Sequence, residues 1–166
     1  MLEQMVHDLV IPKYFYDWLI ERGFKTAPAS TKYHGAFKGG LYEHSCNVTN
    51  ELCRLTECLG LTWERKNSPL IVGMFHDLCK IDAYVRNDQC ACWEHNDNQL
   101  IRGHGEKSVM LLSQFMTLTE EEILCIRYHM GAYETNYWNQ FDLAIKKYPN
   151  VLFTHTADML ASKLKV

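Results

Sequence analysis

Residues 73–80 read GMFHDLCK, and this stretch places an adjacent histidine and aspartate at the end of an apolar run. The apolar side chains around the pair, from Ile71 to Leu78, are typical of a buried helix. Burying the imidazole of His76 beside the carboxylate of Asp77 is costly unless other groups satisfy both. The stretch therefore indicates a helical core with a polar site inside it, whose remaining members come from elsewhere in the chain.

The composition fits one globular domain. With 166 residues, of which 47% are hydrophobic, the chain is long enough to bury a single substantial core. Its formal net charge of −3 argues against a protein whose whole surface binds nucleic acid, although a local cationic pocket is compatible with it. No nucleic-acid-binding motif is recognisable, so a stable partnership with long nucleic acid is not expected.

The chain contains seven cysteines, an odd number, and several lie in apolar stretches of helical period. This favours reduced thiols in a cytoplasmic protein over a secreted disulfide framework. The first residues lack the features of a signal peptide, and no apolar run approaches the roughly 18 residues that span a bilayer. No membrane partner is therefore expected. Cys90, Cys92 and His95 suggest zinc, but their spacing is not that of a standard finger and a fourth ligand is missing.

Helical periodicity and helix-breaking residues indicate an all-α fold, a compact bundle of about six to seven helices. Helices are expected at residues 2–22, 41–59, 68–79, 105–116, 119–130, 138–147 and 150–164. Pro12 is expected to kink or divide the first of them, and Ser68 to cap the third. Thr119 and Glu122 have the spacing of a capping box. Residues 82–101 lose the helical period and are expected to form an irregular loop or hairpin insertion.

Six histidines and aspartates recur along this helical map at a regular distance. They are His44, His76, Asp77, His104, His129 and Asp158. Successive groups are separated by 25 to 32 residues, which is about one helix and its connection, so successive helices can each direct one ligand to a common centre. Taken singly, each has a plainer interpretation as a surface or satisfied core residue. Together they favour a site for Mn, Fe, Ni, Co, Zn or Mg.

The ordered pattern of these residues resembles the HD-domain superfamily of metal-dependent phosphohydrolases. The motifs that carry the resemblance are GGLYEH, HDLCK, GHGEKSV, IRYHMG and THTADMLASK. They are most similar to small stand-alone HD proteins related to the HD domain of certain bacterial 3′–5′ exoribonucleases. The similarity spans residues 33–163, which implies a single HD domain over residues 1–166, with residues 1–32 as a helical extension packed on the core.

The resemblance also implies roles for individual residues. His44, His76, Asp77 and Asp158 match the four core metal ligands of the family. The remaining two histidines, His104 and His129, match those that bind a second ion in binuclear members, with Asp77 then bridging the two ions. Lys80 matches the lysine that lies close to the reacting phosphate. One departure is that Cys79 stands where the family usually has glycine, which removes no ligand.

The implied activity is hydrolysis of a small phosphorylated substrate, a nucleotide, short oligonucleotide or related phosphoester, by attack of metal-bound water. Asp77 and Lys80 are then the expected catalytic residues, with one or two divalent ions as the cofactor. Lys80, Lys107 and Arg102 are candidate cations for the substrate phosphate, and His34 is a candidate for the mouth of the site. For Lys107 and Arg102 a solvated surface position, and for His34 an ordinary loop position, is an equal alternative.

Two other functions remain open at this point. A regulatory HD module could hold a metal ion or a nucleotide without turnover, although such a module would be expected to lose ligands and none is missing here. A nucleic-acid-binding partner subunit is a third possibility, which the acidic charge weakens. Within the enzyme class, the residues do not distinguish a phosphomonoesterase from a phosphodiesterase. The oligomeric state is also left open.

Overall fold

The computed structural model describes residues 1–164, and most of them are helical. The α-helices of this part of the chain are α1 (Leu2–His7), α2 (Lys13–Glu21), α3 (Gly40–Leu59), α4 (Ser68–Phe75), α5 (Gly105–Leu112), α6 (Glu120–Arg127), α7 (Trp138–Lys147) and α8 (Asn150–Leu164). The 3-10 helices are η1 (Leu78–Asp82), η2 (Gly131–Tyr133) and η3 (Thr135–Tyr137). None of the described helices is both long enough and apolar enough to cross a membrane.

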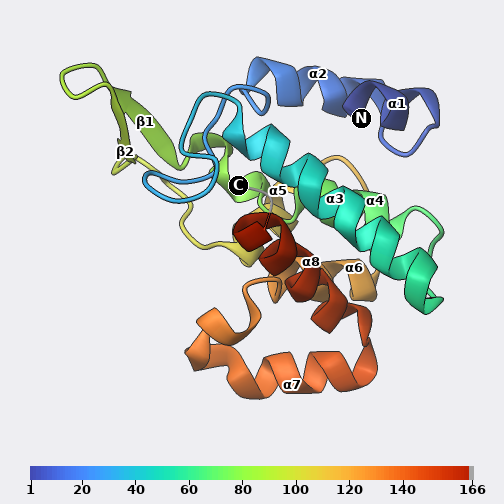
Figure 1. Cartoon of the computed structure of the whole chain (residues 1–166). Helices are drawn as coiled ribbons and strands as arrows, with labels where there is room; N and C mark the ends of the chain where they lie inside the picture. The colour runs from blue at the N-terminus through green and yellow to red at the C-terminus, as the bar shows by residue number, and fades with distance from the viewer. Residues whose placement is uncertain (165–166) are drawn as a thin grey trace.

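The sheet of the described residues has two strands, β1 (Tyr84–Asn87) and β2 (Cys92–His95), which pair in an antiparallel hairpin. Tyr84 lies opposite His95, and Asn87 lies opposite Cys92. Figure 1 shows the hairpin projecting from the side of a bundle that is otherwise helical. The predicted all-α fold with a hairpin inserted near residues 82–101 is confirmed.

The longest helix, α3, organises the bundle because it packs against both α4 and α8. Next to these, α6 packs on α8, and α5 packs on α6 and η1. In Figure 1, α1 and α2 lie along one edge of the molecule, and α7 lies at the opposite edge beneath α8. The turns that follow α4 and α6 and the start of α5 are thereby brought to the interior, beside α3 and α8.

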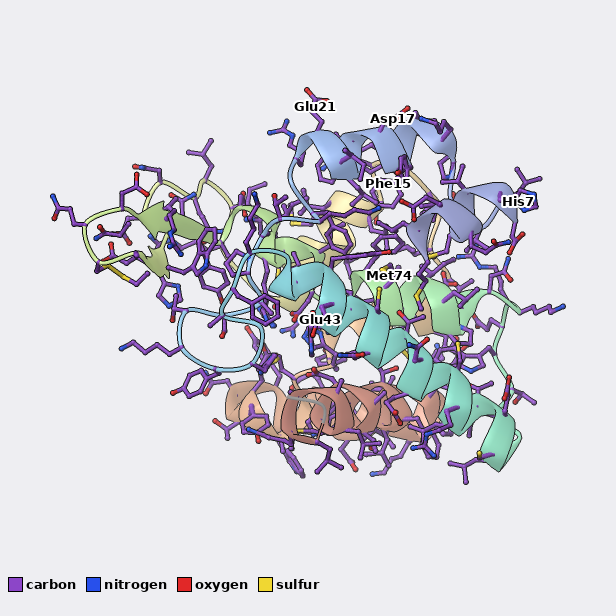
Figure 2. The ribbon with its side chains drawn as sticks, turned by 45° about the horizontal axis from the view of Figure 1, so that its top comes forward. His7, Phe15, Asp17, Glu21, Glu43 and Met74 are labelled. Atoms are coloured by element: carbon purple, nitrogen blue, oxygen red, sulfur yellow. A yellow bond between two sulfur atoms is a disulfide. The ribbon has the colours of Figure 1, made fainter. Side chains whose placement is uncertain are left out.

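One hydrophobic cluster connects the N-terminal helices to the rest of the bundle. Phe15 of α2 is fully buried, and its ring centroid lies 5.1 Å from that of Phe75 at the end of α4. Figure 2 shows Phe15 on the inner side of α2 and Asp17 on the outer side. Burying a phenylalanine side chain contributes about 1.5–3 kcal/mol, so these contacts hold α2 firmly on the bundle.

The N-terminal segment forms two separate helices, so residues 1–164 contain eight α-helices, one above the expected range. Pro12 is the N-cap of α2 and has an extended backbone, with φ −73° and ψ 150°. Proline provides no N–H for the preceding helix to use, and residue 9 turns the chain with a positive φ of 55°. Pro12 therefore divides the segment, which was one of the two expected outcomes.

The third predicted helix is shorter than expected and begins differently. It ends at Phe75, and Asp77, with φ −102° and ψ 19°, leads into the tighter η1 helix. The N-cap is Asn67, so the prediction that Ser68 caps this helix is wrong. The Ser68 hydroxyl is engaged elsewhere, because it donates a 2.8 Å hydrogen bond to Oε1 of Glu122.

The capping box predicted at the start of α6 is confirmed. The Glu122 backbone N–H donates to the Thr119 hydroxyl oxygen, and the Glu122 carboxylate accepts from the Thr119 N–H. The same carboxylate, which is fully buried, also accepts hydrogen bonds from Arg65 and Ser68. One glutamate therefore joins the start of α6 to the start of α4 and to the loop before it.

The prediction that all the cysteines are reduced is wrong for one pair. Cys90 and Cys92 form a disulfide at the tip of the hairpin. Cys90 lies in the turn between the strands and Cys92 begins β2, and Ala91 between them has a positive φ of 50°, which brings their sulfur atoms together. The other cysteines, at positions 46, 53, 58, 79 and 125, are free thiols.

Candidate metal centre

The predicted metal-ligand residues come from five parts of the chain and meet in the interior. They are His44 on α3, His76 and Asp77 just after α4, His104 as the N-cap of α5, His129 in the turn after α6, and Asp158 within α8. His76 and His129 are fully buried, and Asp77 is 2% exposed. The structure thus brings together all six residues that the spacing selected.

Asp77 lies at the middle of the group, and its two oxygens face different histidines. Its Oδ2 is 3.6 Å from Nε2 of His44 and 3.5 Å from Nε2 of His76. Its Oδ1 is 2.9 Å from Nε2 of His104 and 3.4 Å from Nε2 of His129. The carboxylate therefore has one histidine pair on each side.

Asp158 completes one of these two sides. Its Oδ1 lies 3.1 Å from Nε2 of His44 and 4.0 Å from Nε2 of His76. The two Nε2 atoms are themselves 3.3 Å apart. We call His44, His76, Asp158 and Oδ2 of Asp77 the four-residue side, and His104, His129 and Oδ1 of Asp77 the three-residue side.

Backbone carbonyls fix the orientation of two of the imidazole rings. Nδ1 of His76 lies 2.8 Å from the Gly73 carbonyl oxygen, and Nδ1 of His129 lies 2.7 Å from the Ile126 carbonyl oxygen. A carbonyl oxygen only accepts hydrogen bonds, so each Nδ1 must carry the hydrogen. Nε2 of each ring then faces Asp77 and is the nitrogen left to bind a metal ion, which is how histidine ligands of metal ions are commonly held.

The three-residue side contains three buried polar atoms that make no hydrogen bond of good geometry, although two of them, in Asp77 and His104, lie 2.9 Å apart. They are Oδ1 of Asp77, Nε2 of His104 and Nε2 of His129. Leaving such atoms unsatisfied costs free energy, and a divalent cation among them would satisfy all three at once. Three overlapping groups each have ligand atoms within 4.8 Å of one another, so these residues could hold a metal ion: His44, His76 and Asp77; Asp77, His104 and His129; and His76, His129 and Asp158. Imidazole and carboxylate ligands suit Zn, Mn, Fe, Co and Ni.

Charge around Asp77 keeps this carboxylate ionised. Burial alone would raise the pKa of Asp77, but the charges of Lys80, His76 and His104 hold it well below its ordinary value. Nζ of Lys80 lies 2.6 Å from Oδ2, and Asp77 in turn raises the pKa of this lysine despite its burial. Burial likewise opposes protonation of His104, but Asp77 raises its pKa to about 10. The centre therefore has a strong attraction for positive charge.

Cys79 packs against one of the candidate ligands, His104. Cys79 is 3% exposed, and its Sγ lies 3.5 Å from Nδ1 of His104. Its backbone N–H donates a 3.0 Å hydrogen bond to the Ser108 hydroxyl on α5. The side chain thus fills the space behind His104, on the side of the ring that faces away from Asp77.

A cavity of about 490 Å³ opens beside the centre, and both charged and aromatic residues form its wall. Its polar lining includes Asp77, Lys80, His104 and Asp158. The rest is formed largely by aromatic, methionine and small polar side chains, together with one further lysine: Ala29, Ser30, Tyr33, His34, Tyr84, Met130, Tyr133, Met159, Ser162 and Lys163. This volume is in the range of small-molecule sites.

The predicted substrate residues divide into two groups. Lys80 and His34 line the cavity, and burial together with the charge of His44 lowers the pKa of His34 to about 4. Lys107 lies outside the lining and is not a solvated surface lysine, because it is 3% exposed and its Nζ pairs with Asp82. Arg102 is exposed, and its Nη2 lies 3.5 Å from the Asp97 carbonyl oxygen.

Sequence reasoning missed the part of the wall that α8 supplies. Ser162 and Lys163 follow Asp158 by four and five residues, and a spacing of four places two side chains on the same helix face. This signal was available once Asp158 had been chosen. Tyr33 carried no such signal, because it reaches the cavity wall beside Ser162 and Lys163 only through the folded path of the loop of residues 24–39.

Gly105 sets the distance between two segments that carry candidate ligands. A Cβ on this residue would lie 2.3 Å from the carbonyl oxygen of Arg127, so α5 approaches the end of α6 backbone to backbone. The residue directly follows His104, and Arg127 lies two residues before His129. The close approach therefore positions both histidines of the three-residue side.

We expect Gly105→Ala to separate these segments and to destabilise the protein by about 1–3 kcal/mol, the usual cost of overpacking. It should also weaken divalent-metal binding, because His104 and His129 move apart. Urea unfolding and isothermal titration with Mn²⁺ measure the two effects. Met110→Ala, on the exposed face of the same helix, serves as the matched control. Unchanged stability and metal affinity in Gly105→Ala would contradict the expected role.

One curated protein similar to this chain is a phosphodiesterase. It is the dihydroneopterin 2′,3′-cyclic phosphate phosphodiesterase of Methanocaldococcus jannaschii, which is 27% identical over 100 residues. The match covers 57% of this chain and 40% of the relative, so the chain spans less than half of that protein's length. No protein-family model matches the chain. No solved structure matches it either.

Proposed function

We propose that this chain is a metal-dependent phosphohydrolase of the HD-domain type, one domain over residues 1–166 with its HD core at 33–163. The observation that carries the proposal is the position of Asp77, whose two oxygens face two separate sets of nitrogen ligands. The similarity to a phosphodiesterase supports the same class of reaction. The open cavity beside the ligands supports turnover over a role in metal storage.

The four-residue side would hold one divalent ion and the three-residue side a second, with Asp77 shared by both. Candidate ions are Mn, Fe, Ni, Co, Zn and Mg. When bound, such ions supply Lewis-acid polarisation of a phosphoryl group and lower the pKa of water. The chain itself contributes fixed ligand geometry, because His76 and His129 are each held by a backbone carbonyl.

Lys80 would neutralise negative charge on the substrate phosphate. Its ammonium group is buried, paired with Asp77 and part of the cavity wall, so it lies where a phosphate beside the centre would come to rest. A positive charge held in place in a poorly hydrated site stabilises developing charge more than it would in water. His34, on the cavity wall with a largely neutral imidazole, is a candidate hydrogen-bonding partner of the substrate.

Lys80→Met preserves the length of the side chain and removes its charge. We expect kcat/KM to fall about a hundredfold, the typical cost of losing one group that stabilises transition-state charge. Metal binding should persist, because Lys80 is not among the ligands. Lys146→Met, which removes an exposed charge on α7, is the control. Steady-state kinetics measure this loss of kcat/KM. A wild-type kcat/KM in Lys80→Met would show that Lys80 takes no part in the mechanism.

The substrate we propose is a small cyclic or linear phosphodiester attached to a planar heterocycle, such as a nucleotide or a pterin. The named substrate of the similar phosphodiesterase is a cyclic phosphate of this kind. The cavity supports it, because Tyr84 and Tyr133 on its wall offer ring faces on which a heterocycle can stack. A cavity of about 490 Å³ suits a mononucleotide better than a long nucleic acid. A cytoplasmic location would fit such a substrate.

The proposal is tested by hydrolysis of a substrate panel with Mn²⁺, Ni²⁺, Co²⁺ or Mg²⁺. The panel contains nucleoside 2′,3′-cyclic phosphates, nucleoside monophosphates, cyclic dinucleotides and short oligonucleotides. Release of a phosphomonoester from the cyclic phosphates, abolished by a chelator, is the expected result. Metal-dependent binding of these compounds without hydrolysis of any would overturn catalysis in favour of a regulatory metal- or nucleotide-binding module.

A further inference from the structure

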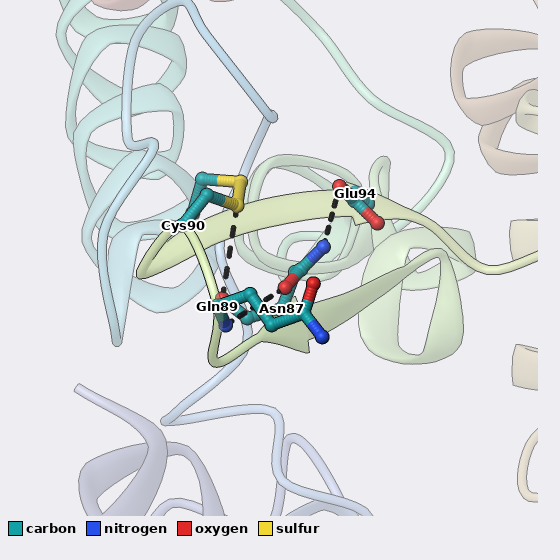
Figure 3. The surroundings of a disulfide bond; sticks show 5 residues. Asn87, Gln89, Cys90 and Glu94 are labelled. Carbon is teal, nitrogen blue, oxygen red and sulfur yellow. Dashed lines mark hydrogen bonds between the residues drawn. A yellow bond between two sulfur atoms is a disulfide. The ribbon is translucent and has the colours of Figure 1, made fainter.

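The tip of the β1–β2 hairpin carries a second cluster of metal-ligating side chains, separate from the Asp77 centre. Cys90 is exposed, Cys92 is partly exposed, and their disulfide lies at the turn between the two strands (Figure 3). In Figure 1 this turn is the part of the hairpin that extends furthest from the helices. Thiol reagents and metal ions in solution therefore have access to it.

Glu94 lies on the same side of the hairpin as the sulfur atoms. Successive side chains of a strand alternate between its faces, so Cys92 and Glu94, two residues apart on β2, share one face. The side-chain amide of Asn87, opposite Cys92 on β1, donates a 2.8 Å hydrogen bond to Oε1 of Glu94 and so orients the carboxylate. The sulfur atoms of Cys90 and Cys92 and a carboxylate oxygen of Glu94 lie within 4.8 Å of one another.

We propose that this hairpin tip is a redox-gated zinc site, formed by the thiolates of Cys90 and Cys92 and the carboxylate of Glu94. Thiolate and carboxylate groups are established zinc ligands, and the exposed position leaves a fourth place for water. In the disulfide state the two sulfur atoms are bonded to each other, and no thiolate is present to bind the ion. The oxidation state of the pair thus determines whether zinc binds.

The opening step is thiol–disulfide exchange with a small dithiol reductant. The reductant transfers two electrons and two protons, the bond between the two sulfur atoms breaks, two cysteine thiols form, and the reductant becomes a disulfide. Binding of Zn²⁺ then releases the two thiol protons to solvent, because the ion binds thiolates. The sulfur atoms are free to move apart to fit the ion, since they lie at an exposed turn.

His95 does not belong to this set. It follows Glu94 on the strand and therefore projects from the opposite face. There its ring lies opposite Tyr84, with the ring centroids 5.3 Å apart. The zinc hypothesis based on Cys90, Cys92 and His95 is thus replaced by one in which Glu94 is the third ligand.

Cobalt titration tests this site in the presence of the Asp77 centre, because only thiolate ligands give sulfur-to-cobalt charge-transfer absorption in the near ultraviolet. The protein is treated with a dithiol, the reductant is removed without oxygen, and Co²⁺ is added. We expect one equivalent of thiolate-bound cobalt in the reduced protein, displaced by Zn²⁺, and none in the oxidised protein. Asp77→Ala should retain the absorption, which separates this proposal from the proposed catalytic function.

Three variants test whether the cobalt signal depends on the proposed ligands. Cys90→Ser should abolish the absorption, Glu94→Gln should weaken cobalt binding about tenfold, and Cys58→Ser, at an exposed free thiol of α3, should change nothing. Circular dichroism checks that each variant is folded. The proposal is overturned if the reduced wild-type protein shows no thiolate-to-cobalt absorption, or if Cys90→Ser retains it.

Discussion

Asp77→Ala is expected to reduce phosphoester hydrolysis by more than about a thousandfold, because it removes the one carboxylate shared by both sides of the centre. Each Asp77 oxygen lies within 3.6 Å of two histidine Nε2 atoms, so no other residue can substitute for it. The loss should be accompanied by loss of tight divalent-metal binding. Steady-state kinetics and isothermal titration with Mn²⁺ measure the two effects.

Two further measurements show whether the loss of activity is specific to the Asp77 carboxylate. Asp142→Ala removes an exposed carboxylate of α7 and should leave both activity and metal binding at the wild-type level. Circular dichroism of Asp77→Ala must show a folded protein, which is expected because the hydrophobic cluster is untouched. A folded Asp77→Ala protein that hydrolyses the same substrates at the wild-type rate would exclude the proposed mechanism.

Glu122→Ala is expected to give the largest loss of stability, about 2–4 kcal/mol. The carboxylate is fully buried and accepts hydrogen bonds from Arg65, Ser68 and the Thr119 backbone. Its removal leaves the Ser68 hydroxyl without its acceptor in the interior and removes half of the capping box. The loss falls short of the full range for a broken buried ion pair because Arg65 is 41% exposed and stays partly hydrated.

Urea unfolding followed by circular dichroism measures this effect as a shift of the midpoint. The matched control is Glu120→Ala, two residues earlier on α6, whose exposed carboxylate pairs with Lys147 in water and should contribute little. Equal midpoints for Glu122→Ala and the wild-type protein would show that the buried network does not contribute to stability.

Sequence reasoning succeeded where the signal is local. The helices at 138–147 and 150–164 begin and end where periodicity and Pro149 predict, and the capping box at Thr119 depends on residues three apart. The six candidate ligands could also be selected from the sequence, because positions within or at the ends of successive helices leave a regular spacing along the chain. Their relative positions around Asp77 were not, since these follow from helix packing.

The features that could not be predicted from the sequence depend on side-chain contacts between residues far apart in the chain. The sequence suggests that Lys107 is either a solvated surface lysine or a substrate-binding cation. In the structure its ammonium group is buried and pairs with Asp82, 25 residues earlier. The bond from Ser68 to Glu122 similarly joins residues 54 positions apart, which explains why Ser68 is not available as a cap. Neither contact has a sequence signal, because each depends on which helices become neighbours in the bundle.

The most direct test of the metal centre is anomalous X-ray scattering from crystals of the protein loaded with Mn²⁺. We expect one anomalous peak among His44, His76, Asp77 and Asp158, and a second among Asp77, His104 and His129. These positions correspond to the two sets of donor atoms around the Asp77 carboxylate. Mn²⁺-loaded crystals without an anomalous peak among these six residues would contradict the proposed metal centre.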